Sequence, residues 1–435
     1  MSRGTGEPTH VIVVGAGFAG VACAKGIAKD PRVRVTVLDK AGYHQFQPLL
    51  YQVATAELTG DDITFPLDHV FGKHPTIEPR AAEVMSVDPA AGRVTLADGD
   101  TIAGDVLVLA AGSSPNFFDT PGAAEHAYPL YSMEDARRVR ARVLEVYRDA
   151  ADNPELVERG ALTFVIVGGG PTGVETAGAL AELVHNVMPH RHERLATAHP
   201  RVVLVDLGHA VLAPFSDAAH TYTADQLRRR GVELRLGTSA TEIDADRLTL
   251  SDGTVIPTRL VVWGGGVTAA PLASRAGLPQ GRGGRIDVRP DLTVPGFPRV
   301  YALGDLANTP GGDEAALPGL GSVAQQAGRW AADNILADIA GGAPRPFHYH
   351  DKGIMAMIGR KAAVAEVGER HHEMHGRVAF AAWLGVHAQL LADTNAELKA
   401  FVTWAEEFYL RPHHRSAALL DPANIDTPRI DWSAT

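Results

Sequence analysis

Cysteine is almost absent from this sequence: Cys23 is the only one among 435 residues. A single thiol cannot form an intrachain disulfide, so the sequence excludes catalysis by a redox-active cysteine pair. Cys23 lies in an apolar stretch that reads as a helix, and we expect it to be a small buried core residue.

Long apolar runs and an excess of positive charge are also missing. No stretch reaches the roughly 18 uninterrupted apolar residues of a membrane-spanning helix, and the polar segment 1–9 has no apolar signal-peptide core. The net charge of −11 argues against a nucleic-acid partner and against strong attraction of the whole molecule to anionic lipid. We therefore expect a cytoplasmic protein, attached at most to the cytoplasmic face of a membrane.

What the sequence does contain is a strand–turn–helix pattern at its N-terminus. The apolar run VIVV is typical of a buried strand, and it is followed by Gly15, Gly17 and Gly20 with GxGxxG spacing. The first glycine allows the tight turn, the second lets a pyrophosphate approach the backbone, and the third lets the helix pack closely on the sheet. The next strand, 34–38, ends at Asp39, where a carboxylate can bind an adenosine ribose. This order predicts a dinucleotide-binding fold.

The same pattern occurs a second time. The run FVIV is followed by Gly168, Gly170 and Gly173, and the later strand RVVLVD ends at Asp206. An insertion places Asp206 further from its glycines than Asp39 is from its own. Two nucleotide folds in one chain predict two dinucleotides, and the natural chemistry between them is hydride transfer. An acid at position 206 favours NADH over NADPH, because a 2′-phosphate would meet a carboxylate.

The rest of the chain fits two such folds. Apolar strands end at Gly112 and Gly266, in equivalent places of the two halves, and the strand 299–303 delivers Gly304 and Asp305 back to the first fold. The fold class is therefore α/β, with two Rossmann-like dinucleotide-binding domains and a C-terminal helical region. The expected boundaries are 1–120 with 290–345 for the first domain, 121–289 for the second, and 346–435 for the C-terminal region.

Two short segments allow a structural and a functional interpretation. The segment 42–55 is rich in aromatic and amide side chains, and we expect it to pack under the first cofactor. The segment His371–His375 carries histidines four residues apart, which could ligate a metal on a helix. No further ligand set completes such a site, so we expect a solvated loop and no metal.

Five motifs together resemble the type II NADH dehydrogenases, the single-subunit, non-pumping NADH:quinone oxidoreductases. The resemblance covers roughly residues 10–370 and continues more loosely to the end. The more specific motifs are FQPLLYQVA at 46–54 and GGGPTGVE at 168–175. The others are GAGFAG at 15–20, WGGGV at 263–267 and ALGD at 302–305.

The resemblance implies non-covalent FAD in the first domain and NADH in the second. Carried over by position, the residues expected to hold FAD are Gly15, Gly17, Gly20, Asp39, Gln47, Val84, Gly112, Gly304, Asp305, Ser322 and Val323. Those expected to hold NADH are Gly168, Gly170, Thr172, Gly173, Asp206, Gly265 and Gly266. Glu175 would lie near the nicotinamide and Gln326 near the flavin and the quinone, and we assign these two as catalytic. An acid near a helix N-terminus is also favoured by the helix dipole alone, which is the structural alternative for Glu175.

Two features depart from the family pattern. Members carry AQxAxQxG after the Gly-Asp strand, whereas this chain has Ser322 at the first glutamine and retains the second as Gln326. A hydroxyl reaches less far than an amide, so quinone binding is expected to be weaker or altered. The C-terminal region keeps an apolar face at 378–391 but is acidic from Asp393 onward. A peripheral membrane contact through 376–420 and packing on the protein itself or on a second subunit both remain open.

The predicted function is transfer of a hydride from NADH to FAD, followed by two-electron reduction of a quinone. One alternative is an NADH-dependent flavin oxidoreductase with another small acceptor, and another is a flavin redox sensor that signals through 376–420. We expect a homodimer without a nucleic-acid partner. The sequence leaves the identity of the acceptor open.

Overall fold

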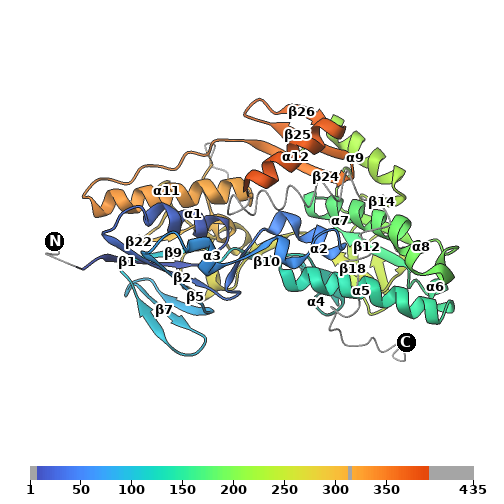
Figure 1. Cartoon of the computed structure of the whole chain (residues 1–435), viewed down its shortest axis with the longest axis horizontal. Helices are drawn as coiled ribbons and strands as arrows, with labels where there is room; N and C mark the ends of the chain where they lie inside the picture. The colour runs from blue at the N-terminus through green and yellow to red at the C-terminus, as the bar shows by residue number, and fades with distance from the viewer. Residues whose placement is uncertain (1–6, 312–315, 391–435) are drawn as a thin grey trace. The chain divides into compact units, whose positions relative to one another are not determined.

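The computed structural model describes residues 7–311 and 316–390, which form two compact units (Figure 1). The first unit contains the chain up to Gln45, with 64–114 and 267–351; the second contains 46–63 and 115–266 and continues from Lys352. These limits differ from the expected boundaries. Residues 46–63 belong with the second unit because their helix α2 (Leu50–Ala54) packs against α5 (Met133–Asp152) and α7 (Pro171–Glu182).

A parallel sheet with one antiparallel edge strand forms the centre of the first unit, in the order β21-β22-β9-β1-β2-β5. Its strands are β1 (Thr9–Val14), β2 (Val33–Asp39), β5 (Ile77–Ala81), β9 (Val106–Leu109), β21 (Thr293–Val294) and β22 (Phe297–Ala302). The strands are apolar because both faces of the sheet are covered. Helices α1 (Phe18–Ile27) and α11 (Gly321–Ile339) lie side by side along one face (Figure 1), and Cys23 is fully buried there, as expected.

The other face of this sheet packs against a small antiparallel sheet of β6 (Val84–Asp88), β7 (Arg93–Leu96) and β8 (Thr101–Ala103). A turn at Asp98–Gly99 joins its last two strands, and Gly99 has φ +88° there. A left-handed backbone of this kind favours glycine. The short pair β3 (Tyr43–Gln45) and β4 (Thr64–Pro66) flanks the excursion of the chain into the second unit.

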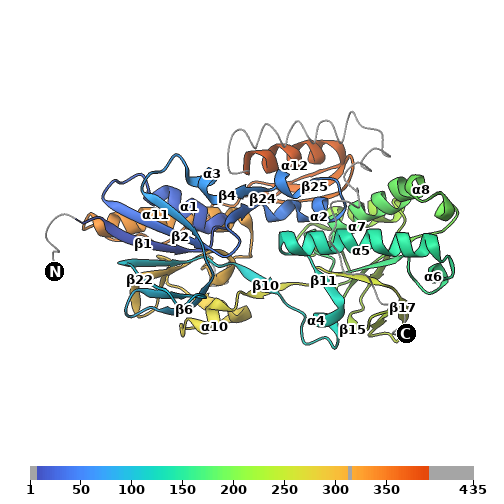
Figure 2. The same cartoon turned by 60° about the horizontal axis from the view of Figure 1, so that its bottom comes forward.

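The second unit repeats the arrangement with a sheet in the order β11-β18-β12-β13-β14. Its strands are β11 (Ala127–Pro129), β12 (Thr163–Val167), β13 (Arg201–Asp206), β14 (Val232–Leu236) and β18 (Leu260–Trp263), all parallel. Helices α5 and α7 run along it (Figure 2), and α9 (Asp217–Arg229) connects β13 to β14. Helix α5 is capped at its N-terminus by Ser132, which forms a capping box with Asp135.

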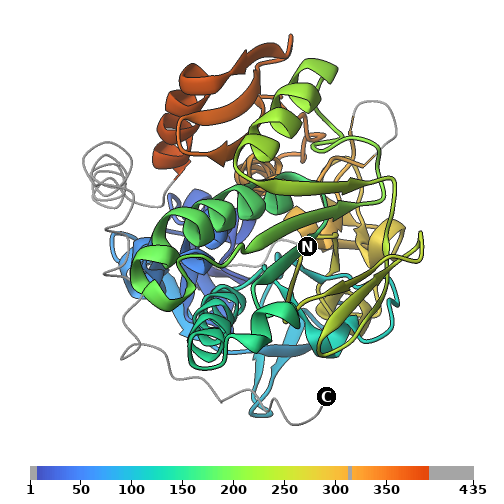
Figure 3. The same cartoon turned by 90° about the vertical axis from the view of Figure 1, so that its right-hand side faces the viewer.

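A third element of the second unit is the antiparallel sheet of β24 (Gly353–Gly359), β25 (Ala362–Val367) and β26 (His372–His375). It packs beside α9, which is the yellow-green helix next to the orange-red strands in Figure 3, and under α12 (Gly376–Leu390). The expectation of a loop at 371–375 is therefore wrong. Residues His372–His375 pair there with the preceding strand β25 in a local hairpin, which the polarity of the segment does not reveal.

The C-terminal expectations are tested only in part. Helix α12 covers the apolar stretch, whereas the acidic segment from Asp393 lies outside the described residues. In the part of the chain that the structure describes, no helix is both long enough and apolar enough to cross a bilayer. Within the same ranges, no group of three or more His, Cys, Asp or Glu side chains could hold a metal ion.

Candidate dinucleotide sites

The first glycine loop joins β1 to α1, and its three glycines do three different things. Gly15 has φ +100°, and a Cβ there would overlap the Ala110 carbonyl of the neighbouring strand. A Cβ at Gly20 would overlap the Gly15 carbonyl, so this glycine lets α1 lie close to the turn. A Cβ at Gly17 would meet nothing within 4 Å. Packing therefore requires Gly15 and Gly20, whereas Gly17 borders open space that a ligand could occupy.

The second glycine loop, between β12 and α7, has the same geometry. Gly168 has φ +112° and lies against the Gly264 carbonyl, and a Cβ at Gly173 would overlap the Gly168 carbonyl. Gly170 again has nothing within 4 Å of a Cβ. Each loop thus presents an unobstructed backbone at the N-terminus of a helix, where N–H groups and the helix dipole favour a phosphate.

The two acids predicted to bind ribose occupy equivalent positions. An oxygen of Asp39 accepts the N–H of Ala16 at 2.8 Å, and an oxygen of Asp206 accepts that of Gly169 at 2.5 Å. Each donor directly follows the first glycine of its loop. The insertion between Gly173 and Asp206 is accommodated by a π-helical turn (Leu183–Val187) and short helices, so it does not displace β13 from its register beside β12.

These observations test whether the chain can hold two dinucleotides. Both loops have a strained first glycine, an open second glycine, a tightly packed third glycine and a carboxylate fixed at the end of the second strand. These are the structural requirements of a pyrophosphate and ribose site. The residues present fit the group in each unit.

Other predicted FAD residues gather in the first unit. Gly112 has φ +72° just after β9, Gly304 has φ +64° after β22, and the Asp305 carboxylate accepts the Ser113 hydroxyl at 3.0 Å. Val84 begins β6 and is buried against Leu96 on β7. Gln47 belongs by contrast to the short helical segment Gln47–Leu49 of the second unit.

Sequence reasoning missed His44 beneath the first loop. Its Nδ1 lies 2.7 Å from the Ala16 carbonyl, and its ring packs edge-on against Phe18. Burial lowers the pKa of His44, with the hydrogen bond to Ala16 opposing that shift. A carbonyl can only accept, so Nδ1 carries the proton, and the imidazole ties β3 to the glycine loop. In the sequence, only the aromatic character of the segment 42–55 pointed to a role for His44.

The residues at the motif that departs from the family pattern lie one turn apart on α11. The Ser322 hydroxyl is 3.0 Å from the Tyr349 hydroxyl. The Gln326 amide donates to the His350 carbonyl at 2.9 Å and accepts the His350 N–H at 3.0 Å. Both side chains therefore bind the returning segment 349–350, while Val323 between them is buried.

Glu175 lies in the second turn of α7 and is only 8% exposed. Its Oε1 accepts the N–H of Met357 on β24 at 3.1 Å. Burial raises the pKa of Glu175 to about 8, although the Met357 N–H and the Trp383 indole favour the charged form. Glu175 therefore holds its proton at neutral pH, unlike a solvated acid that only complements a helix dipole.

Glu175 lies on the face of α7 that packs against β24 and the turn after it. A Cβ at Gly178 would overlap the Ile358 carbonyl, so the helix and the strand approach through a glycine. At the far end of α7, Glu182 accepts the Arg360 N–H at 2.8 Å and pairs with the Arg230 guanidinium at 3.3 Å. The sequence positions 175, 178 and 182 lie on one helical face. Two carboxylates on this face thus satisfy N–H groups at an edge of the C-terminal sheet.

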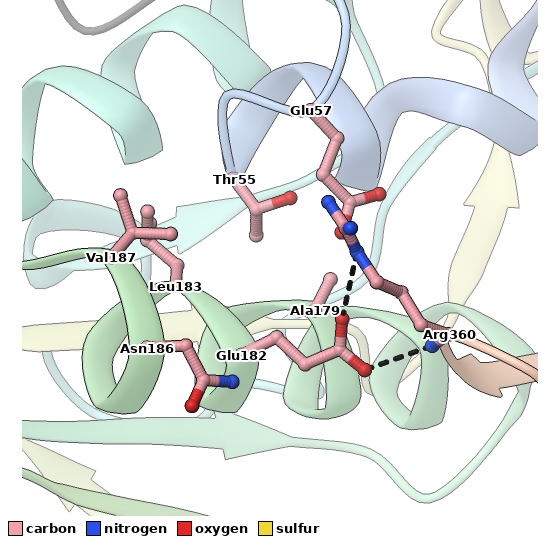
Figure 4. Close-up of a pocket in the computed structure, with 8 residues that line it drawn as sticks. All are labelled: Thr55, Glu57, Ala179, Glu182, Leu183, Asn186, Val187 and Arg360. Atoms are coloured by element: carbon pink, nitrogen blue, oxygen red, sulfur yellow. Dashed lines mark hydrogen bonds and ion pairs between the residues drawn. The ribbon is translucent and has the colours of Figure 1, made fainter. Parts of the chain in front are cut away.

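Figure 4 shows the pocket at the far end of this contact. The Arg360 guanidinium projects toward Glu182, and Glu57 and Thr55 approach from the segment that follows α2. All of these residues belong to the second unit. The lining is dominated by the ion pair that fastens α7 to β24, so we attribute this pocket to that contact and not to a cofactor.

The remaining predicted residues lie around the second loop. Thr172 is exposed at the start of α7, and its carbonyl accepts the Thr176 hydroxyl. Gly265 and Gly266 follow β18, and Gly266 has φ +140°. The segment beside them was missed: the Trp263 indole donates to the Asn116 carbonyl at 2.8 Å, and the Asn116 N–H donates to Gly266 at 3.0 Å. These contacts join segments that are far apart in the sequence, so local sequence patterns do not reveal them.

Comparisons with known proteins agree with this geometry. Residues 9–328 match the family described as pyridine nucleotide-disulphide oxidoreductase. Two curated relatives are the type II NADH:quinone oxidoreductases Ndh and NdhA of Mycobacterium tuberculosis. Ndh is 34% identical, covering 92% of this chain and 88% of the relative. NdhA is 33% identical, covering 96% and 92%.

Solved structures show the same fold. A structure of NDH2 from Plasmodium falciparum in complex with NADH superposes with a TM-score of 0.85 at 17% identity, covering 94% of this chain and 100% of that one. The sulfide:quinone oxidoreductase of Aquifex aeolicus superposes with a TM-score of 0.69 at 19% identity, covering 93% and 96%. The match includes both nucleotide units, which supports the predicted α/β fold class.

Proposed function

Because the chain belongs to the type II NADH:quinone oxidoreductases, we propose that its two glycine loops divide one reaction between them, with FAD in the first unit and NADH in the second. The protein is an FAD-dependent oxidoreductase that transfers electrons from NADH to a quinone. The equivalence of the two loops, each open only at its second glycine, is the observation that supports this division.

When bound, FAD would supply the redox chemistry, which is acceptance of a hydride from NADH and delivery of two electrons to a quinone. The chain itself binds and orients. The backbone N–H groups of Gly15–Gly20 and Gly168–Gly173 would bind the two pyrophosphates, and Asp39 and Asp206 would bind the two adenosine riboses. Asp206 also disfavours a 2′-phosphate, which would place like charges together.

We assign Glu175 as the group that holds a proton near the nicotinamide. Oxidation of NADH by a quinone consumes one proton beyond the hydride, since NADH + H⁺ + quinone gives NAD⁺ + quinol. A carboxyl whose pKa is raised to about 8 by burial is protonated at neutral pH, and it would give this proton to the reduced flavin or the quinone, where the proton is consumed. His387, also buried, cannot, because burial lowers its pKa to about 4.

Gln326 and Ser322 are our candidates for the acceptor side. Both are half-buried in the first two turns of α11, and both are hydrogen-bonded to 349–350. A quinone carbonyl would have to share or displace these bonds. This competition supports altered quinone recognition at Ser322, where the family has a glutamine.

The whole relay can be tested by following flavin absorbance anaerobically. The purified holoprotein is mixed with NADH and then with a soluble quinone. Rapid bleaching followed by rapid recovery is expected. Bleaching without recovery would favour another acceptor or a redox sensor, and an absence of bleaching would refute the hydride relay.

A second proposal concerns the surface of α12. Val378 and Val386 are 66% and 38% exposed, whereas Phe380 and Trp383 between them are buried. We propose that this helix contributes to a peripheral membrane contact through 376–420. In the full chain, the double substitution Val378→Asp with Val386→Asp should reduce binding to liposomes. Unchanged binding would refute the membrane contact, and a change in the oligomeric state would point instead to a homodimer interface.

A further inference from the structure

One exposed aromatic residue stands at the second nucleotide loop without a role in the function described so far. Phe118 is 62% exposed, and it is the only large aromatic side chain that is exposed to this degree among the described residues. Its backbone has φ +50°, and that of Asp119 has φ +55°. Two successive non-glycine residues in the left-handed region are strained, and such strain persists only where the surroundings enforce it.

The surroundings that enforce it are visible. The Asn116 side chain accepts the Phe118 N–H at 2.9 Å, forming a tight turn. The Asn116 backbone is hydrogen-bonded to both Trp263 and Gly266, as described above. The neighbouring ring, Phe117, packs inward against Trp263 with ring centres 5.5 Å apart. The segment thus packs the Phe117 ring against the core and keeps the Phe118 ring exposed.

The position of the Phe118 ring follows from Gly266. A Cβ at Gly266 would lie 3.2 Å from the tip of that ring, so the ring lies over the glycines that end β18. In the sheet, β12 lies between β18 and β13. The chain moves from β12 to β13 on one side and returns in β18 on the other, which makes the carboxyl ends of β12 and β18 the switch point where ligands bind.

The direction of a dinucleotide along this edge is set by Asp206. That acid ends β13 and binds the adenosine ribose, and the pyrophosphate lies at the loop after β12. The nicotinamide half must then extend over β18, toward Gly265 and Gly266. An exposed aromatic face at this point can stack on a planar heterocycle, and an oxidised nicotinamide adds a cation–π attraction.

We propose that Phe118 contacts the nicotinamide end of the bound dinucleotide and that the strained turn 116–119 exists to present this ring. The proposal rests on the proposed function, since it requires NADH in the second unit. It adds a binding residue for the nicotinamide half of the dinucleotide, which the glycine motif does not contact.

The test compares two ligands and two matched variants of the full-length holoprotein by titration calorimetry. NAD⁺ carries the nicotinamide and cannot be oxidised further, whereas ADP-ribose lacks the nicotinamide. Phe118→Gly removes the ring and relaxes the turn. Asp119→Gly relaxes the adjacent strained residue and keeps the ring, so it controls for the backbone. Phe118→Tyr keeps an aromatic face.

Phe118→Gly should weaken NAD⁺ binding by about 5- to 100-fold, the range expected when an aromatic stacking partner is lost. ADP-ribose binding should be unchanged, and Asp119→Gly and Phe118→Tyr should bind both ligands as the wild type does. The thermal midpoint of Phe118→Gly should not fall by more than that of Asp119→Gly, because each replacement relieves left-handed strain.

Three results would overturn the inference. Equal weakening of both ligands would place the ring elsewhere along the dinucleotide or show that the loop was disturbed. Unchanged NAD⁺ binding with loss of bound flavin absorbance would assign the ring to the other cofactor. If the wild-type protein bound neither ligand, the NADH site itself would be refuted, a failure distinct from that of Phe118.

Discussion

Glu175→Gln should change how the stability of the protein depends on pH. In the unfolded chain a glutamate carboxyl titrates near its ordinary pKa of 4.5, whereas burial raises the pKa of Glu175 to about 8 in the folded chain. Between these values the folded state binds one more proton than the unfolded state. Raising the pH therefore destabilises the fold, and the stability present below pH 4.5 is lost progressively until the pH passes 8.

The size of the effect follows from about 1.4 kcal/mol per pKa unit. The full shift corresponds to about 5 kcal/mol, and the part lost between pH 6.5 and 8 is about 2 kcal/mol. This window is chosen because His387 acts in the opposite direction at lower pH. Burial lowers the pKa of His387 to about 4, so its stabilising contribution is lost as the pH falls from 6.5 toward 4.

The assay is a series of thermal unfolding curves at pH 6.5, 7, 7.5 and 8 for the wild type and for Glu175→Gln. A glutamine side chain does not titrate, so the wild type should lose stability relative to the variant as the pH rises. Glu182→Gln is the matched control on the same helix and strand. It breaks ion pairs with Arg230 and Arg360, which stay charged throughout, and should shift all curves without changing their pH dependence. A constant difference between wild type and Glu175→Gln across this window would refute the reasoning.

The other predictions concern the glycine loops, the two acids and α11. Gly17→Ala and Gly170→Ala should preserve the thermal midpoint of the apoprotein, because a Cβ at either position meets nothing, yet weaken FAD and NADH binding respectively. Gly20→Ala and Gly173→Ala should instead destabilise the fold; if all four variants behaved alike, the distinction between open and packed glycines would be wrong. Asp206→Asn should weaken NADH binding by about 10- to 100-fold, as expected for loss of a charged hydrogen bond, and it should reduce the preference for NADH over NADPH. Asp39→Asn should reduce FAD retention without changing the preference for NADH over NADPH. Ser322→Gln should lower the KM for quinone. Tyr349→Phe is the control, because it shows how much of the change in KM comes from losing the hydrogen bond between Ser322 and Tyr349. An unchanged KM in Ser322→Gln would refute the role assigned to this position.

The sequence was sufficient where function depends on local geometry. The order of strand, glycines, helix, strand and acid predicts both nucleotide loops, because each glycine answers a constraint within a few residues of itself. The end of β13 at Asp206 and the capped start of α5 at Ser132 follow from local patterns in the same way. In both loops, the glycine expected to let a pyrophosphate approach is the one at which a Cβ would meet nothing within 4 Å.

Prediction failed where a residue depends on partners distant in the chain. Residues 46–63 group with the second unit because α2 packs on α5 and α7, which lie far along the chain. The high pKa of Glu175 arises from burial beside Met357 and Trp383, about 180 and 210 residues further along the chain. A motif can place an acid in the second turn of a helix, but only the fold removes water from it.

Helix α7 combines both kinds of information. Its first turn carries the open glycine at 170 and the packed glycine at 173, which belong to the nucleotide loop. One face of its remaining turns, at positions 175, 178 and 182, contacts β24. Because Oε1 of Glu175 is hydrogen-bonded to the backbone of β24, the proton affinity of this acid depends on where the C-terminal sheet lies. The GPTGVE motif therefore encodes two features at once, an open backbone at one end of the helix and a contact with a sheet along its side. Only the first of these could be read from the spacing of glycines.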